Sequence, residues 1–238
     1  MAICADHLVA TLPSSATLVL KRAVDVIGSF MGLVLLSPLL LVVSVAIRLE
    51  TPGPACFRQT RVGLQGRPFR IYKFRSMGVD QTANGSALTV GADKRITRVG
   101  AFLRRTKIDE LPQFINVLAG DMSLVGPRPE VPEFVEFYSP EQRAILLSMR
   151  PGMTDYAAIL FRDESSMLDQ DRDPIAVYKH VIMPIKFGYY ERYRHEIGLI
   201  NDLRIILATV LLLVVGHVPR MFGIESELKS LPSKRIAA

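Results

Sequence analysis

The sequence predicts a small α/β domain, mainly helical and with a few short strands, that associates with a membrane through an N-terminal helix. Three observations predict this class. The 238 residues suffice for one compact domain, and a long uncharged apolar run lies near the N-terminus. The remainder alternates helical apolar spacing with short β-type runs between turns. Two cysteines and four scattered histidines exclude a disulfide-rich scaffold and show no zinc-type spacing.

The membrane segment is the run of 22 uncharged residues from Val26 to Ile47. As a straight helix it would reach about 33 Å, enough to cross a hydrocarbon core of ~30 Å. Ser37 and Pro38 lie in its middle, where proline removes a backbone hydrogen bond, so we expect the helix to kink or break there. Basic residues flank both ends of the run, which suits a re-entrant helix with both ends at the cytoplasmic face.

Two alternatives for this segment differ in topology. A straight crossing leaves a carbonyl about four residues before Pro38 without a donor, which is costly in lipid unless Ser37 or a neighbouring element satisfies it. A cleavable signal peptide needs a short basic leader, whereas 20 residues precede Lys21 and Asp25 falls at the edge of the run. We therefore expect a re-entrant helix, with a straight crossing as the main alternative.

A basic stretch follows the membrane segment. From Arg48 to Lys107 there are 13 Lys and Arg against 3 Asp and Glu, and residues 108–173 reverse the balance with 5 against 13. The basic stretch indicates either a solvated face or a surface for phosphorylated substrate, anionic lipid or nucleic acid. No nucleic-acid motif accompanies it, so nucleic acid is the weakest of these partners. Within it, Phe69–Phe74 alternates as a strand, and residues 78–92 are typical of a loop.

Two helices are expected next. Apolar residues from Thr97 to Arg105 recur at helical spacing, and a second helix is expected to begin at Asp109 as its N-cap and to stop at Gly120. Asp109 and Glu110 would then sit at the positive end of a helix dipole, which favours ionised carboxylates and attracts phosphate. A plain helix start, with no function, is the alternative for this pair.

A proline-framed arginine and a second apolar run complete the pattern. Arg128 lies between two prolines, which pre-orient it as a bidentate phosphate clamp unless the segment is only a rigid turn. The following Glu130 is expected in a solvated cap or helix face. The uncharged run Ile205–Gly216 has 12 residues, too few to span a membrane, so it predicts either an interfacial helix or one that closes the core.

Several motifs in this order resemble one family, the monotopic bacterial sugar transferases, also called polyprenyl-phosphate phosphoglycosyl transferases. The resemblance runs from Lys21 to Thr209. The motifs are KRAVDVIGS, the break at Ser37 and Pro38, TPGPACFRQTRVG, IYKFRSM, TRVGAFLRRTKIDELPQFINVLAGDMSLVGPRPE and RPGMT. The larger relatives in this family carry an N-terminal multi-span domain, so we expect the minimal form, which lacks it.

The resemblance implies transfer of a sugar-1-phosphate from a UDP-sugar to polyprenyl (undecaprenyl) phosphate with release of UMP, an activity of EC class 2.7.8 that starts surface glycan synthesis. It implies that Asp109 is the nucleophile, forming a phosphosugar-aspartyl intermediate, and that Glu110 is the Mg²⁺ ligand. The chain would then lie at the cytoplasmic face of the bacterial inner membrane. Its partners would be UDP-sugar, polyprenyl phosphate and inner-membrane lipid, with no nucleic acid and with a homodimer left open.

Three basic residues are candidates for holding phosphate oxygens in both steps: Lys73, Arg75 and Arg128. For Lys73 and Arg75, packing or a lipid-headgroup contact is the alternative. The chain departs from the commoner family pattern after RPGMT, where Asp-Tyr-Ala-Ala at 155–158 replaces Gly, a bulky residue, Ala and Gln. This segment is expected to contribute to sugar recognition, so the sugar is left open.

Four segments follow from these expectations: an N-terminal extension of residues 1–20, a re-entrant membrane helix of 21–48, a cytoplasmic catalytic domain of 49–201, and a C-terminal interfacial helix and tail of 202–238. Two rival functions use the same features. One is a membrane-anchored metal-dependent phosphohydrolase in which water is the second nucleophile, and the other is a non-catalytic scaffold that binds anionic lipid.

Overall fold

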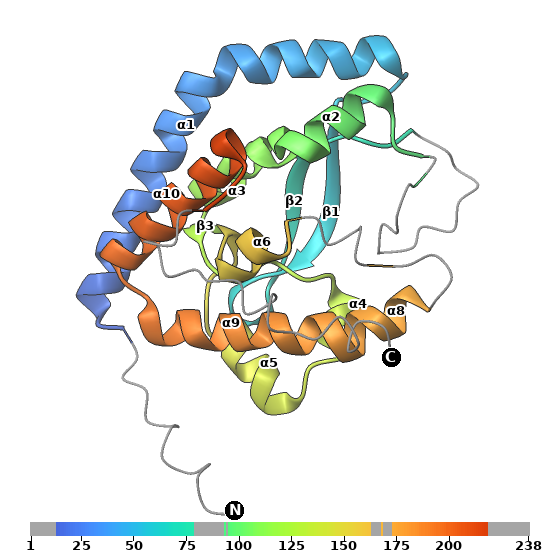
Figure 1. Cartoon of the computed structure of the whole chain (residues 1–238). Coiled ribbons are helices and arrows are strands. Elements are labelled where there is room, and N and C mark those ends of the chain that lie inside the picture. Colours follow the sequence, from blue (N-terminus) through green and yellow to red (C-terminus); the bar gives the residue numbers. More distant parts are fainter. Residues whose placement is uncertain (1–12, 79–92, 94, 163–167, 169–172, 219–238) are drawn as a thin grey trace, which may run out of the picture.

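A long N-terminal helix runs along one side of a body of short helices and two small sheets in this computed structural model, which describes residues 13–78, 93, 95–162, 168 and 173–218 (Figure 1). The mainly helical class with a few short strands is confirmed. The expected loop at 78–92 falls almost entirely outside the described residues, as does most of the extension at 1–20.

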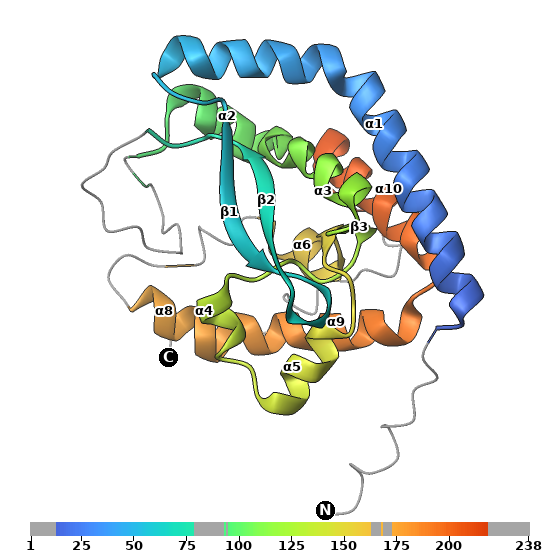
Figure 2. The ribbon, with the colours of Figure 1, turned by 180° about the vertical axis from the view of Figure 1, so that it is seen from behind.

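Helix α1 spans Ser15–Glu50 and is longer at both ends than the expected 21–48. The Ser14 side chain caps it by accepting from the Thr17 backbone N–H. Figures 1 and 2 show a bend midway along α1, so that its two halves run in different directions. Pro38 lies inside the helix, and the Ser37 hydroxyl donates to the Val34 carbonyl at 2.8 Å. The hydroxyl thus replaces the donor that proline lacks, as expected.

The N-terminal half of α1 is fixed to the body by charged side chains. The Lys21 ammonium lies 2.6 Å from the Asp202 carboxylate, and both groups are largely buried. A buried pair of this kind holds its elements together firmly, because removing one partner leaves an uncompensated charge. The hydrogen bonds in this half join Lys21 to Asp202 and Val125, Arg22 to Val117 and Leu118, and Asp25 to Leu124.

The C-terminal half of α1 is attached to the same body. Val43 and Ile47 are buried against Phe74 and Leu103. The last residue, Glu50, accepts hydrogen bonds from backbone N–H groups at the start of α2, Arg98–Thr106. Both ends of α1 therefore contact one body.

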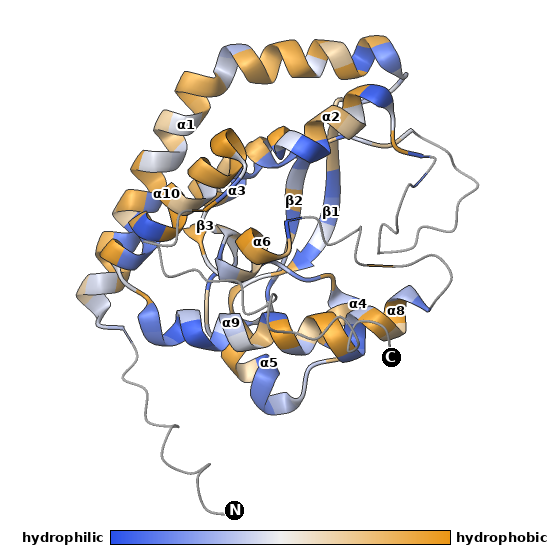
Figure 3. Ribbon diagram, in the orientation of Figure 1, coloured by the Kyte–Doolittle hydropathy of each residue, from blue (hydrophilic) through white to orange (hydrophobic). Residues whose placement is uncertain are grey.

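The outer face of α1 is apolar and exposed (Figure 3). Within the described part of the chain, α1 is the one helix long and apolar enough to cross a membrane. An exposed apolar surface of this extent indicates contact with lipid, in agreement with a membrane-associated domain. The exposed side chains include Ile27, Phe30, Val34, Leu35, Leu41, Val42 and Leu49.

The expected strand is confirmed as β2, Pro68–Phe74, which pairs antiparallel with β1, Cys56–Val62. A short 3-10 helix of one turn, η1 (Leu64–Gly66), joins them. Side chains alternate along β2 as expected: Phe69 and Ile71 are buried on one face, and Phe74 packs toward α1 on the other. Lys73 shares the face of Phe69 and Ile71.

Helix α2, Arg98–Thr106, begins at Thr97, whose side chain accepts from the Gly100 N–H. The second expected helix is wrong at its start. Lys107 adopts a left-handed conformation with φ of 59°, and a 3-10 segment η2 follows over Ile108–Gln113. Only then does α3, Phe114–Ala119, begin, and it ends at Gly120 as expected. Asp109 is therefore not an N-cap.

The second sheet is a parallel pair of three-residue strands, β3 (Ser123–Val125) and β4 (Gly152–Thr154). Two glycines permit this pairing, because a Cβ on Gly152 would lie 2.1 Å from the Gly126 nitrogen. The close approach holds the chain leaving β3 against the chain entering α6. The remaining elements are α4 (Pro132–Val135), α5 (Pro140–Leu147), α6 (Tyr156–Leu160), α8 (Pro174–Val177), η3 (Tyr178–Ile182), α9 (Met183–Glu196) and α10 (Leu199–Val215).

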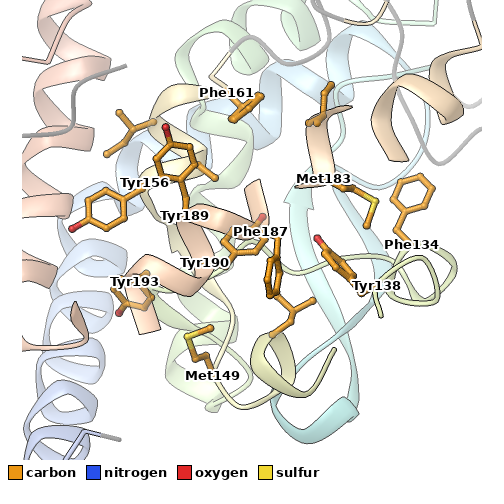
Figure 4. Close-up of a cluster of buried hydrophobic side chains, with 14 of the residues drawn as sticks. Phe134, Tyr138, Met149, Tyr156, Phe161, Met183, Phe187, Tyr189, Tyr190 and Tyr193 are labelled. Atoms are coloured by element: carbon orange, nitrogen blue, oxygen red, sulfur yellow. The ribbon is translucent and has the colours of Figure 1, made fainter. Parts of the chain in front are cut away.

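The main core is rich in aromatic side chains gathered around α9 (Figure 4). Helix α10 closes this core with Ile205 and Ala208, while Leu207 and Val214 on another face are exposed. The expectation of a helix that closes the core is thus confirmed, and the interfacial placement of α10 stays a prediction. The labelled core residues are Phe134, Tyr138, Met149, Tyr156, Phe161, Met183, Phe187, Tyr189, Tyr190 and Tyr193.

Candidate active site

Glu110 is held by two cations from different elements. Its Oε1 lies 2.8 Å from Lys73 Nζ on β2 and 2.8 Å from an Arg128 nitrogen in the segment after β3. A second Arg128 nitrogen reaches Oε2 at 3.2 Å, so the arginine binds the carboxylate with both arms. Although burial opposes ionisation, Arg128 and Lys73 together hold the pKa of Glu110 well below its ordinary value. Glu110 is therefore ionised at neutral pH.

Asp109 lies beside Glu110 but in a different environment. Its side chain is buried, and Oδ1 has no hydrogen-bond partner among the described residues. Burial raises the pKa of Asp109, while the charges of Lys73 and Lys107 oppose the rise. The expectation that the ionised form of both carboxylates is favoured agrees with the lowered pKa of Glu110. It is wrong for Asp109, because desolvation outweighs the neighbouring charges and no α-helix begins at this point.

Asn116 on α3 fixes the carboxylate segment against β2. Its Oδ1 accepts from the Tyr72 N–H at 2.9 Å, and its Nδ2 donates to the Arg70 carbonyl at 2.8 Å. The side chain thereby imitates a neighbouring strand along the free edge of β2, which brings η2 and Lys73 together. The sequence analysis missed Asn116. The available signal was an amide within an otherwise apolar helical segment, where a buried amide needs partners.

Arg75 is placed apart from these groups. Its guanidinium donates to the carbonyls of Thr51 and Pro52, in the turn that follows α1. The structure therefore brings Lys73 and Arg128 to Glu110 but gives Arg75 a bond to the backbone. Ser37 and Pro38 lie inside α1, where Ser37 bonds within the helix.

A large hollow opens in front of the two carboxylates, between α1, the first sheet, α9 and α10. Basic side chains line the part near Asp109 and Glu110, and their charge suits an anionic ligand. Deeper in the hollow, Glu130 is buried and accepts from the Tyr178 hydroxyl at 3.1 Å. The expectation of a solvated Glu130 is wrong, because its side chain is buried and bonded to Tyr178 of η3. The basic residues in the lining of the hollow are Arg61, Lys73, Arg75, Arg95, Arg104, Arg105, Lys107, Arg128, Arg162 and Lys186.

The donor set fits a divalent metal that is shared with a ligand. Among residues 13–78, 93, 95–162, 168 and 173–218, no three His, Cys, Asp or Glu side chains gather as a metal cage. Mg²⁺ is commonly held by one or two carboxylates together with substrate phosphates and water. The orphaned Oδ1 of Asp109 and the carboxylate of Glu110 are such donors, and both belong to the hollow.

Comparison with known proteins matches the chain to one family and to several of its relatives. The model of the family described as bacterial sugar transferase matches residues 16–216. The chain is 41% identical over 202 residues to the UDP-glucose:undecaprenyl-phosphate glucose-1-phosphate transferase of Caulobacter vibrioides, covering 84% of this chain and 71% of that protein. It is 46% identical over 155 residues to the exopolysaccharide production protein PSS of Rhizobium leguminosarum, covering 59% and 73%.

A further relative is longer and names a different sugar. The UDP-N-acetylgalactosamine-undecaprenyl-phosphate N-acetylgalactosaminephosphotransferase of Aeromonas hydrophila is 44% identical over 157 residues, 65% of this chain but only 37% of that protein. The similarity thus covers about a third of that relative's length. Since the family model spans most of the chain, from the N-terminal half of α1 to the end of α10, the chain belongs to the bacterial sugar transferase family.

Proposed function

We propose that this chain transfers a sugar-1-phosphate from a UDP-sugar to polyprenyl phosphate, with release of UMP, and that Asp109 is the nucleophile. The observation that supports this most directly is the buried pair of unequal carboxylates. Asp109 presents an oxygen without a partner, while Glu110 is ionised between two cations. Two of the relatives named above, those of Caulobacter vibrioides and Aeromonas hydrophila, have names that include a UDP-sugar and undecaprenyl phosphate, in agreement with this reaction.

In the first step, a carboxylate oxygen of Asp109 attacks the phosphorus that bears the sugar. The new aspartyl–phosphorus bond forms as the bond from that phosphorus to the bridging oxygen breaks, and UMP leaves with the electron pair. Burial removes water from the nucleophile, and the nearby charges of Lys73 and Lys107 keep the ionised form accessible. Arg128 and Lys73 stabilise the negative charge on the transferring phosphate oxygens.

In the second step, an oxygen of polyprenyl phosphate attacks the same phosphorus. The aspartyl–phosphorus bond breaks, the Asp109 carboxylate is restored, and the product is a polyprenyl diphosphate sugar. The acceptor's phosphate is anionic, so the basic lining of the hollow serves this step too. Its hydrocarbon chain would lie along the apolar outer face of α1 and α10.

We propose Mg²⁺ as the cofactor, held by Glu110 and the pyrophosphate of the donor. When bound, it supplies charge neutralisation on the pyrophosphate and eases departure of UMP. Glu110 suits this role because its pKa is held well below the ordinary value, so it is available as an anion over the whole physiological pH range.

We also propose a re-entrant placement of α1, with the body at the cytoplasmic face of the inner membrane. Lys21 in one half of α1 and Glu50 at its far end both contact the same polar body. A helix that crossed the bilayer would place one of these contacts on the other side, and its polar groups would lose their partners. The bend of α1 lets both halves return to one side, and Pro38 inside the helix is a residue type that causes such bends.

The proposal is tested with purified chain, undecaprenyl phosphate, Mg²⁺ and a panel of UDP-sugars, with measurement of UMP release and lipid-linked sugar. Asp109→Asn is expected to abolish both products while leaving membrane association unchanged, because it removes the nucleophile with little change of shape. Glu110→Gln should be severely impaired, with an altered Mg²⁺ dependence. Near-normal UMP formation by Asp109→Asn would contradict the covalent route. Sugar phosphate released into water instead of lipid would favour the phosphohydrolase.

A further inference from the structure

A second polar cluster lies in the same hollow, beyond Arg128. It consists of Glu130, Tyr178, Lys186 and Tyr190, and all four are buried although they line the hollow. The Tyr178 hydroxyl lies 3.1 and 3.2 Å from the two Glu130 oxygens. Lys186 Nζ lies 5.1 Å from the centre of the Tyr178 ring and 5.9 Å from that of Phe161. A carboxylate, an ammonium and two hydroxyls thus line one hollow.

Tyr190 differs from the other members of this cluster in its hydroxyl group. Its side chain is 0% exposed, on α9 among the aromatic core residues of Figure 4, yet its hydroxyl has no hydrogen-bond partner among the described residues. A buried hydroxyl without a partner is unfavourable and needs an explanation. Because Tyr190 lines the hollow, a ligand in the hollow can supply the missing partner.

Asp155 connects this cluster to the segment of the carboxylate site. It is fully buried, and one of its oxygens accepts from the Ala158 N–H at the start of α6. The charges of Lys186 and Arg128 both act on it. Ala157 and Ala158 line the hollow beside the cluster, so the segment 155–158 forms part of this wall.

The charge of the cluster distinguishes its ligand from a phosphate. Near Asp109 and Glu110 the lining is strongly basic, which suits the pyrophosphate. In the second cluster a buried carboxylate, Glu130, stands among the cations Lys186 and Arg61 and the tyrosine hydroxyls. A fixed acceptor among several donors suits a ring that bears several hydroxyls, since each hydroxyl both donates and accepts, whereas the carboxylate would repel a phosphate. The ring of the sugar, attached directly to the reacting phosphorus, has this chemistry.

We infer that Glu130, Lys186 and Tyr190 form the subsite that binds the sugar ring of the donor and selects among sugars. This inference rests on the proposed function. Buried polar groups of this kind discriminate strongly, because a sugar that lacks the matching hydroxyl leaves them unpaired. The names of two relatives indicate that the sugar differs between similar proteins. One is named for glucose and the other for N-acetylgalactosamine, while both names include undecaprenyl phosphate.

The test measures binding separately from turnover. In an Asp109→Asn background, which keeps the donor intact, the affinities of UDP and of four UDP-sugars (glucose, galactose and their N-acetylamino forms) are determined in nanodiscs with Mg²⁺. The parent should bind one UDP-sugar more tightly than the others and than UDP. Adding Tyr190→Phe should weaken that UDP-sugar by about tenfold, the loss of one good hydrogen bond, and leave UDP unchanged.

Tyr189→Phe is the matched control, because Tyr189 is adjacent on α9 and buried but does not line the hollow. It should leave the whole affinity profile unchanged. Lys186→Met provides a second variant that removes the charge and keeps the length. Each protein is first checked for a folded state by its thermal transition.

The outcomes separate the two proposals. An unchanged sugar profile in both Tyr190→Phe and Lys186→Met would overturn the subsite, whatever the turnover. A parallel loss of affinity for UDP would also overturn it, since the cluster would then contact the nucleotide. Selective UDP-sugar binding without UMP release by the unmodified chain would overturn the proposed function and leave the subsite standing. Absence of UDP-sugar binding to the parent would overturn both.

Discussion

Asp109 and Glu110 are neighbours in the chain, yet their environments move their pKa values in opposite directions. The difference comes from partners: Glu110 meets Lys73 and Arg128, whereas Asp109 Oδ1 meets none among the described residues. Two carboxylates whose pKa values diverge can take different roles in one reaction. The sequence identified the pair, and the family resemblance implied different roles for its members. The opposite pKa shifts could not be predicted, because the partners of Glu110 come from β2 and from the segment after β3.

A third carboxylate, Asp155, gives a prediction for stability against pH. Burial raises the pKa of Asp155 from its ordinary 3.8 to about 6. The folded state therefore binds a proton that the unfolded state has released, so stability falls as pH rises from about 4 to about 7. The shift corresponds to a loss on the order of 3 kcal/mol at neutral pH.

We expect Asp155→Asn to be more stable than the parent at pH 7.5 and nearly equal to it at pH 4. Asparagine keeps the acceptor for the Ala158 N–H and carries no charge to bury. Thermal unfolding in detergent at several pH values measures the difference. A gap between the two proteins that stays constant across this range would contradict the assigned pKa.

At the scale of the elements, the pairing of β3 with β4 depends on glycine. A Cβ on Gly152 would lie 2.1 Å from the Gly126 nitrogen, which is backbone and cannot move aside cheaply. We expect Gly152→Ala to separate the two strands and to destabilise the fold by more than ~3 kcal/mol, the upper range for ordinary overpacking. Chemical unfolding gives the free energy.

Gly188 is the matched control for this prediction. It lies inside α9, and nothing approaches within 4 Å of the position that its Cβ would take. Gly188→Ala should stabilise the protein by up to about 1 kcal/mol through helix propensity. Equal effects of the two substitutions would show that close packing at β3 and β4 is not what Gly152 provides.

Elements with local signals were predictable, and those fixed by distant contacts were not. The helical spacing from Thr97 to Arg105, the alternation of β2 and the stop at Gly120 all follow from neighbouring residues. The 3-10 segment η2 does not, because the left-handed Lys107 is stabilised from outside: its ammonium donates to the carbonyl of Arg162. Asn116 is likewise defined by the edge of β2.

At the scale of the whole molecule, the topology of α1 can be tested by labelling. We expect single cysteines at Leu18 and Arg58, in a background without native cysteines, to resist an impermeant maleimide in intact cells and to react once the inner membrane is opened. Both sites lie on parts of α1 and β1 attached to one body, so they share one side. Periplasmic labelling at position 18 would favour the straight crossing.

The double variant Ser37→Ala, Pro38→Leu extends this test. It restores the backbone donor to the Val34 carbonyl and straightens the helix, so position 18 should become reactive from the periplasm. Ser44→Ala is the control, since the Ser44 hydroxyl bonds to the Leu40 carbonyl in an uninterrupted part of α1. This control should leave labelling unchanged, and a shift there would mean that any loss of a helix hydroxyl alters topology.

The bond between Lys21 and Asp202 also has a consequence in time. The two residues are 181 positions apart, and a ribosome adding 5–20 residues each second needs roughly 10–35 seconds to make the second after the first. Throughout that interval α1 exists without the partner that later fixes its N-terminal half. Its shape in the nascent chain must therefore depend on what it carries itself, above all the bond from Ser37 to Val34. The bond between Lys21 and Asp202 therefore stabilises a shape of α1 that formed before the two residues could contact each other.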